Sequence, residues 1–166
     1  MNGSCNPAPM GSIPSTNNMP SSKFQSPINF STLKANHTFI IKLAIVNMET
    51  GHFVNSDTNY YAAPQQLNSK GQIIGHSHFV VQKISSFTDT TVLDPTKFVS
   101  FSAVNTAAVN GVLSVSVDGG LAPGCYRLSS INTAANHQPA LVPIAKRGSL
   151  DDMIYVSRNV IFDDIG

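Results

Sequence analysis

Short runs of β-branched and aromatic residues, separated by turn residues, constrain this chain more than any other feature of its sequence. Residues 39–46 read Phe-Ile-Ile-Lys-Leu-Ala-Ile-Val, and in residues 112–117 apolar residues alternate with serine. Alternation with a period of two is the pattern of a strand that buries one of its faces. No long apolar pattern with a helical period accompanies these runs, so the sequence predicts an all-β fold.

Further runs of the same kind extend this prediction along the chain. The intervals between runs are roughly ten to twenty residues and contain Gly, Pro and Asn, which is typical of an antiparallel β-sandwich. We predict an immunoglobulin-like sandwich. Gly75, inside one of the runs, predicts a bulge or a close approach of two backbones. The additional strands are expected at residues 71–84, 98–104, 125–131, 141–145 and 153–162.

The length of 166 residues fits one domain preceded by a tail. Residues 1–26 are rich in Pro, Ser and Asn and lack the apolar content that offsets chain entropy, so we predict a disordered tail there. Residues 27–166 then form a single β-sandwich domain. Cys5 and Cys125 permit one disulfide between the tail and a late strand, or a free Cys125, and the sequence leaves both open.

Charge is scarce in this chain. Charged residues make up 11% of it and the formal net charge is +1, whereas ordinary soluble domains have roughly 25% charged residues. No basic run exceeds the pair Lys146 and Arg147, so we expect no nucleic-acid partner. No stretch approaches the ~18 apolar residues of a membrane-spanning helix, so we expect no membrane association either. The oligomeric state stays open.

An extracellular location is the expectation for the chain. The first residues do not form a signal peptide, so a secretory signal has been removed or was never present. In a secreted protein, the pattern Asn-x-Ser/Thr would make Asn2, Asn29 and Asn36 candidate glycosylation sites.

Three histidines form the sharpest functional pattern. His76 and His78 are two residues apart in an expected strand, so both imidazoles should project from the same face. His137 lies in a predicted loop after the strand at 125–131. Neutral imidazoles suit copper or zinc, so we predict a metal site made by His76, His78 and His137. Alternatively, these side chains stay solvated or hydrogen-bond neighbouring loops.

A non-enzymatic role is favoured because motifs of nucleophilic, phosphate-binding and metalloprotease sites are missing from the sequence. A second hypothesis is a carbohydrate- or cell-wall-binding module. Tyr60 and Tyr61 could stack on a sugar ring while Gln65 hydrogen-bonds its hydroxyls. The other reading of these tyrosines is that they pack a long loop onto the sandwich.

Residues 71–78, 126–128, 136–139 and 148–152 resemble a group of secreted proteins from mushroom-forming fungi, whose function is not established and which are sometimes labelled as a ribosomal protein. The resemblance covers about residues 10–157 and implies an extracellular fungal protein. More distantly, the order Gly-His-x-His, Pro-Gly and Asn-His-x-Pro is similar to small bacterial periplasmic sandwich domains. That resemblance implies that His76, His78 and His137 cluster in the fold.

Overall fold

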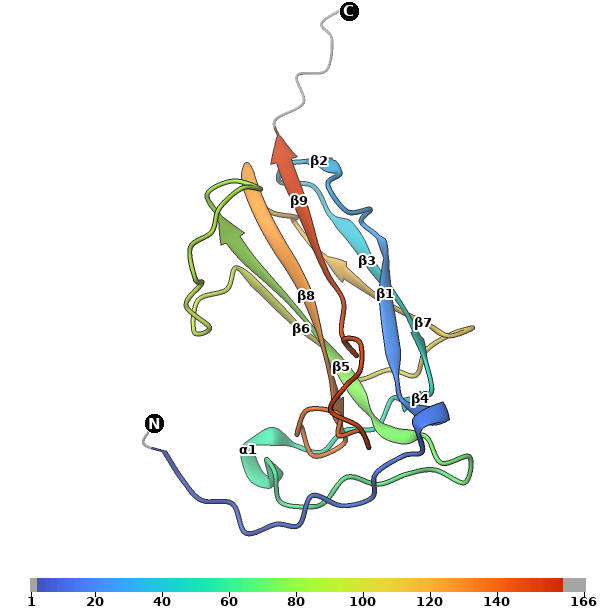
Figure 1. The fold of residues 1–166 in the computed structure, drawn as a ribbon. Helices are drawn as coiled ribbons and strands as arrows, with labels where there is room; N and C mark the ends of the chain where they lie inside the picture. The colour runs from blue at the N-terminus through green and yellow to red at the C-terminus, as the bar shows by residue number, and fades with distance from the viewer. Residues whose placement is uncertain (1–2, 160–166) are drawn as a thin grey trace, which may run out of the picture.

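Two β-sheets pack face to face in the computed structural model, which describes residues 3–159 (Figure 1). The smaller sheet has the order β1–β3–β7, with the strands Ser21–Ser26, Phe39–Val46 and Val112–Val117. The larger sheet has the order β2–β9–β8–β5–β4, and β6 also pairs with β5. Its strands are Thr32–Lys34, Met153–Asn159, Gly124–Ala134, Ile73–Ile84, Met48–Thr50 and, for β6, Ser100–Val104. The helices are the 3-10 helix η1, Thr16–Asn18, and α1, Ser56–Asn59.

The strand order confirms the predicted immunoglobulin-like sandwich. In chain order, β1, β3 and β7 take the places of strands A, B and E of that fold, while β5, β8 and β9 take the places of C, F and G in the facing sheet. Near the start of β8, the hydroxyl of Tyr126 donates a hydrogen bond of 2.8 Å to the carbonyl of Ala122. This contact has the form of the tyrosine corner found at the start of strand F in immunoglobulin-like domains.

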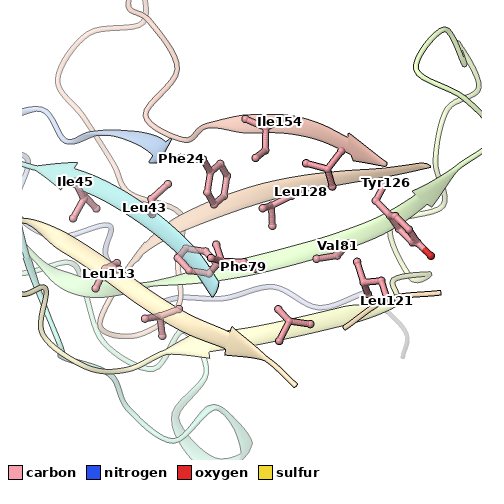
Figure 2. Packing of buried hydrophobic residues seen from close by; sticks show 14 residues of the cluster. Phe24, Leu43, Ile45, Phe79, Val81, Leu113, Leu121, Tyr126, Leu128 and Ile154 are labelled. Atoms are coloured by element: carbon pink, nitrogen blue, oxygen red, sulfur yellow. The ribbon is translucent and has the colours of Figure 1, made fainter. Parts of the chain in front are cut away.

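Apolar side chains from both sheets meet in one core (Figure 2). Leu43 and Leu113 of the smaller sheet face Phe79 and Leu128 of the larger sheet. The rings of Phe24 and Phe79 meet edge to face, with centroids 5.6 Å apart. The buried cluster comprises Phe24, Ile41, Leu43, Ile45, Phe79, Val81, Val104, Leu113, Val117, Leu121, Tyr126, Leu128, Ile154 and Val156.

The sandwich begins earlier in the chain than the sequence predicted. Ser21–Ser26, placed in the disordered tail by composition, form β1 and pair antiparallel with β3. The single aromatic residue Phe24 is buried in the core and anchors this strand. Before it, the backbone N–H of Ser12 donates to the carbonyl of Gln65 at 2.9 Å. The average composition of residues 1–26 did not predict β1, because it takes no account of a single buried aromatic residue or of backbone hydrogen bonds to the edge strand β3.

The two strands expected last in the chain have different outcomes in the structure. Residues 141–145 do not form a strand, and the end of the predicted strand 153–162 lies outside the described residues.

Cys5 is exposed and Cys125 half-buried, and both are free. Across residues 3–159, no helix is long and apolar enough to cross a membrane. The candidate glycosylation sites Asn29 and Asn36 are exposed, so glycosylation there stays a prediction, and Asn2 lies outside the described residues.

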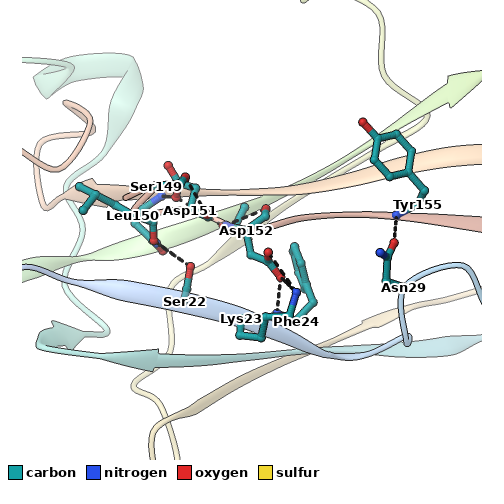
Figure 3. A network of polar contacts seen from close by, with 11 residues as sticks. Ser22, Lys23, Phe24, Asn29, Ser149, Leu150, Asp151, Asp152 and Tyr155 are labelled. Carbon is teal, nitrogen blue, oxygen red and sulfur yellow. Dashed lines mark hydrogen bonds and ion pairs between the residues drawn. The ribbon is translucent and has the colours of Figure 1, made fainter. Parts of the chain in front are cut away.

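A polar network closes one side of the sandwich (Figure 3). The carboxylate of Asp152 accepts a hydrogen bond from the backbone N–H of Phe24 at 2.8 Å. It also forms an ion pair of 3.0 Å with the ammonium group of Lys23. The hydroxyl of Ser22 donates to the carbonyl of Leu150 at 3.0 Å. Asp151 accepts from the backbone N–H of Asn132 in β8 at 2.7 Å. The segment 149–152 thereby ties β1 of one sheet to β8 of the other.

Gly75 gives the first testable prediction. A Cβ at this position would overlap the carbonyl of Thr133 and would lie 2.8 Å from the terminal methyl of Met48, which confirms the predicted close approach of two backbones. Gly75→Ala should therefore lower the free energy of unfolding by about 1–3 kcal/mol through overpacking. Chemical denaturation measures the change. Gly148→Ala is the control because a Cβ there meets nothing within 4 Å, and equal losses in the two variants would contradict the prediction.

Asp151 gives a second prediction. Burial raises the pKa of its carboxyl group above the ordinary value, although hydrogen bonds from Asn132 and Ser130 act in the opposite direction. A carboxyl group with a raised pKa contributes most to stability below its unfolded pKa of about 3.9, and this contribution is lost as pH rises through the folded pKa. Asp151→Asn removes the charge and keeps an acceptor oxygen for Asn132.

We expect the stability of Asp151→Asn, relative to the wild type, to improve as pH increases from about 4 to 7. Denaturation curves at several pH values measure this trend. Asp152→Asn serves as the comparison because it loses the ion pair with Lys23. A relative stability of Asp151→Asn that does not change with pH would exclude a desolvation penalty at this carboxylate.

Candidate metal centre

The outer face of the larger sheet carries three converging histidines. Phe79 and Val81 of β5 point into the core, so alternation directs His76 and His78 to the opposite face of the same strand. The neighbouring strand β8 ends at Ala134, and the chain then turns, with the N–H of His137 donating to the carbonyl of Ala134 at 2.9 Å. The turn brings His137 back over the same face of the sheet.

The ring nitrogens of these residues face one another. His76 Nε2 lies 3.1 Å from His78 Nε2 and 3.1 Å from His137 Nδ1. All three nitrogens lie within 4.8 Å of one another. The three side chains that the sequence analysis selected therefore come together in the fold, from strand β5 and from the turn after β8.

Backbone carbonyls determine which nitrogen of two of these rings carries hydrogen. His76 Nδ1 lies 3.1 Å from the carbonyl oxygen of His52, and His137 Nε2 lies 2.7 Å from that of Val54. A carbonyl can only accept, so both of these ring nitrogens must donate. In a neutral imidazole the remaining nitrogen then carries a lone pair.

The consequence is an unfavourable contact between the facing nitrogens of two neutral rings. His76 Nε2 and His137 Nδ1 are 3.1 Å apart, and each presents a lone pair to the other. No hydrogen atom remains to lie between them unless one ring is protonated. A cation between the nitrogens, either a proton or a metal ion, would relieve this contact. His76 Nε2 also has neutral donors within reach, since His78 Nε2 lies 3.1 Å and the Thr133 hydroxyl 3.3 Å away.

Burial disfavours the proton. Loss of solvation, followed by the nearby rings of His78 and His137, lowers the pKa of His76 to about 4. Loss of solvation, followed by the ring of His137, likewise lowers the pKa of His78 to about 4. These two imidazoles are therefore neutral at physiological pH, which is the protonation state that a metal ligand needs.

The two remaining histidines do not join this cluster. The imidazole of His52 forms a contact of 3.0 Å with the carboxylate of Glu49, and only its backbone carbonyl takes part in the site. His37 contacts the backbone carbonyl of Ala35 through its Nδ1 at 2.8 Å.

An aromatic side chain lies beside each of the three rings. Phe53 meets His76 edge-on at 6.2 Å between centroids, Phe101 of β6 lies 5.0 Å from His78, and Tyr60 stacks on His137 at 5.9 Å. The sequence did not predict the roles of Phe53 and Phe101. Phe101 lies in the expected strand 98–104, and no local pattern connects either residue to the histidines.

The turn after β8 holds the Tyr60 loop in place. The side-chain oxygen of Asn136 accepts hydrogen bonds from the backbone N–H groups of Ala62 and Ala63, at 3.0 and 3.1 Å. Its carbonyl accepts from the N–H of Tyr61 at 3.0 Å. Because Asn136 precedes His137, the same turn positions both the histidine and its stacking partner.

A pocket of about 600 Å³ opens above the histidines. His76 is fully buried, whereas His78 and His137 are half-buried and contribute to the pocket wall. A metal ion held by the three nitrogens would therefore face this pocket. Its wall consists of Phe53, Val54, Asn55, Ser56, Tyr60, His78, Phe101, Ala103, Asn105 and His137.

The structure corrects part of the predicted carbohydrate site. Gln65 is fully buried, and its amide is used by hydrogen bonds to the backbone of Ser12 and Leu141. It cannot hydrogen-bond a sugar. Tyr60 and Tyr61 stack with centroids 4.1 Å apart, and burial, followed by the hydrogen bond with Tyr60, raises the pKa of Tyr61 to about 12. Tyr60 remains exposed at the rim of the pocket, so sugar binding there stays a prediction.

Comparison with known proteins places the chain in a family. The model of the CLU5d N-terminal domain matches residues 22–159, which include the strands described above except for Ser21, the first residue of β1. The chain belongs to the CLU5d N-terminal domain family. A relative from Colletotrichum graminicola, "Pathogenicity cluster 5 protein d", is 43% identical over 152 residues, which is 90% of this chain. The chain spans about a third of that relative, 32% of its length.

These matches confirm the fungal part of the expected resemblance. Membership of a group from mushroom-forming fungi, secretion and the likeness to bacterial periplasmic domains stay predictions. No solved structure matches the chain. The proposed function therefore rests on the geometry of the site in this chain.

The lowered pKa values of the histidines give a third prediction. In the metal-free protein, His76 and His78 should titrate near pH 4 rather than near the ordinary 6.5. A lowered folded pKa means that their contribution to stability is present above about pH 6.5 and is lost as pH falls through about 4. NMR titration of the imidazole signals measures both midpoints. A midpoint near 6.5 for either residue would show that burial does not protect the site from protons.

Proposed function

We propose that this fungal domain is an extracellular metal-binding protein that holds copper or zinc through His76 Nε2, His78 Nε2 and His137 Nδ1. The observation that carries the proposal is the contact between His76 Nε2 and His137 Nδ1, 3.1 Å apart. Both rings donate their only N–H hydrogen to a backbone carbonyl, so two lone pairs face each other, and a metal ion between them would relieve the repulsion.

The spacing of two of the three nitrogen pairs is close to that of a first-row transition-metal site. The three nitrogens all lie within 4.8 Å of one another, so His78 and His137 would have to move closer together to share one ion. A Zn–N bond of about 2.0–2.1 Å with tetrahedral angles separates two ligand nitrogens by about 3.3 Å. The two measured separations around His76 are 3.1 Å. Neutral imidazole donors suit both zinc and copper, and the carbonyls of His52 and Val54 would supply the outer hydrogen bonds that orient ligand histidines.

The surroundings of the site favour binding over catalysis. Apart from Tyr60 and the proposed metal ligands His78 and His137, the pocket wall consists of Phe, Val, Ala, Asn and Ser side chains, which hold a ligand rather than transfer protons near neutral pH. The exposed positions of Asn29 and Asn36 are compatible with glycosylation of a secreted domain. The proposed role is therefore the capture of a metal ion outside the cell.

Isothermal titration calorimetry tests this function, using tag-free protein and solutions of Zn²⁺ or Cu²⁺. The wild type should bind one ion per chain, and His76→Ala, His78→Ala or His137→Ala should each weaken binding by about 100-fold or more, since each removes one ligand. His37→Ala is the matched control, because it removes an imidazole that takes no part in the cluster.

Thermal unfolding provides a second readout of the same binding. At a free metal concentration of about 100 times Kd, binding to the folded state adds about 2.7 kcal/mol of stability. The wild type and His37→Ala should gain stability with metal, while His76→Ala should not. Equal affinity and stoichiometry in the wild type and His76→Ala would rule out the site.

A further inference from the structure

The charge balance of the proposed metal centre is incomplete, and this inference rests on the proposed function. Three neutral imidazoles would leave the full positive charge of a divalent ion uncompensated. Among the described residues that line the pocket, no carboxylate, thiol or other anionic side chain supplies the missing charge. The coordination position that faces the pocket is therefore electrostatically suited to an anion from another molecule.

The walls of the pocket are suited to a flat aromatic group. Phe53, Tyr60 and Phe101 line it and are 49%, 58% and 48% exposed. Each ring lies beside a different ligand histidine, so the three rings surround the position above the metal. Exposed aromatic rings gathered at one concave place mark a binding site, because stacking a ligand ring removes apolar surface from water.

Asn105 adds a polar requirement. Asn105 is one of the residues of the pocket wall, and its side-chain oxygen, shielded from solvent, has no hydrogen-bond partner among residues 3–159. A buried acceptor without a donor costs about 1–3 kcal/mol. A rotation of the Asn105 side chain toward the pocket would let a ligand with an N–H or O–H group near its anionic end satisfy this oxygen.

We infer that the metal-loaded site binds small aromatic ligands that carry an anionic oxygen donor and an adjacent N–H or O–H group. The oxygen takes the position on the metal that faces the pocket, the ring lies among Phe53, Tyr60 and Phe101, and the donor serves Asn105. The pocket volume of about 600 Å³ is in the range of small-molecule sites. Neutral sugars can stack and offer O–H donors, but they lack the anionic oxygen.

Two hydroxamates with the same metal-binding group test this inference. Benzohydroxamate carries a phenyl ring where acetohydroxamate carries a methyl group. Each is titrated by calorimetry into the zinc-loaded full chain and into the metal-free chain. We expect benzohydroxamate to bind the zinc-loaded protein at least about tenfold more tightly than acetohydroxamate, since aromatic contacts account for about that factor. The metal-free chain should bind neither.

Variants in the pocket wall separate the ring contacts from the metal. Phe101→Ala and Tyr60→Ala should still bind one zinc ion per chain and should lose most of the preference for benzohydroxamate. Phe87→Ala is the matched control, because Phe87 is an exposed aromatic residue, 39% exposed, that is not part of the pocket wall. It should retain the full preference.

The outcomes distinguish this inference from the proposed function. If zinc does not bind, the metal site itself is wrong. If zinc binds but both hydroxamates bind equally or not at all, the metal site stands and the aromatic pocket is rejected. Equal binding of benzohydroxamate to the metal-free chain would also overturn the inference, because the metal would then play no part in recognition.

Discussion

The antiparallel pairing of β5 with β8 is the interaction on which both the fold and the site depend. The ladder extends from Gly75 opposite Ala134 to Ile84 opposite Cys125. It places Phe79 in the core and His76 on the outer face, and it ends next to the turn that contains His137. A slip of the register by one residue would exchange the two faces of β5. The same apolar burial that stabilises the sandwich therefore orients the imidazoles.

A second set of contacts fixes the loop of Val54 against the turn of His137 in the absence of a metal ion. The N–H of Val54 donates to the carbonyl of Ala135 at 3.0 Å, while the carbonyl of Val54 accepts from His137 at 2.7 Å. The loop and the turn are thus joined through both backbone groups of Val54: its N–H bonds to the backbone of Ala135, and its carbonyl bonds to the ring of His137. Because the geometry exists before binding, a metal ion would not have to order the loop, and less conformational entropy would oppose binding. The three ligands are positioned by a strand and a hydrogen-bonded turn.

Local patterns were sufficient for β3, β5, β6, β7, β8 and β9 and for the pair His76 and His78, because alternation along a strand is a property of consecutive residues. They did not reveal the short strands β2 and β4. They failed where a distant segment decides the outcome. Residues 141–145 resemble a strand, yet the N–H of Leu141 donates to the side chain of Gln65 at 2.9 Å instead of to a neighbouring strand. The Ser- and Pro-rich segment forms β1 because it pairs with the edge of β3 and because Phe24 packs against Phe79. The aromatic cover of the histidines depends on contacts of this long-range kind.

The position of the site follows from the architecture together with the scarcity of charge. The loop between β3 and β5 and the loop after β8 correspond to the B–C and F–G loops of immunoglobulin-like domains, which lie at one end of the sandwich and form binding surfaces in variable domains. Fold alone does not assign a ligand, so the chemistry of the loops must do so. Here it consists of one buried and two half-buried imidazoles beside aromatic rings, in a chain with only 11% charged residues. Such a site can concentrate positive charge only by taking up a cation. Once a cation is bound, the low-dielectric wall strengthens its attraction for an incoming anion.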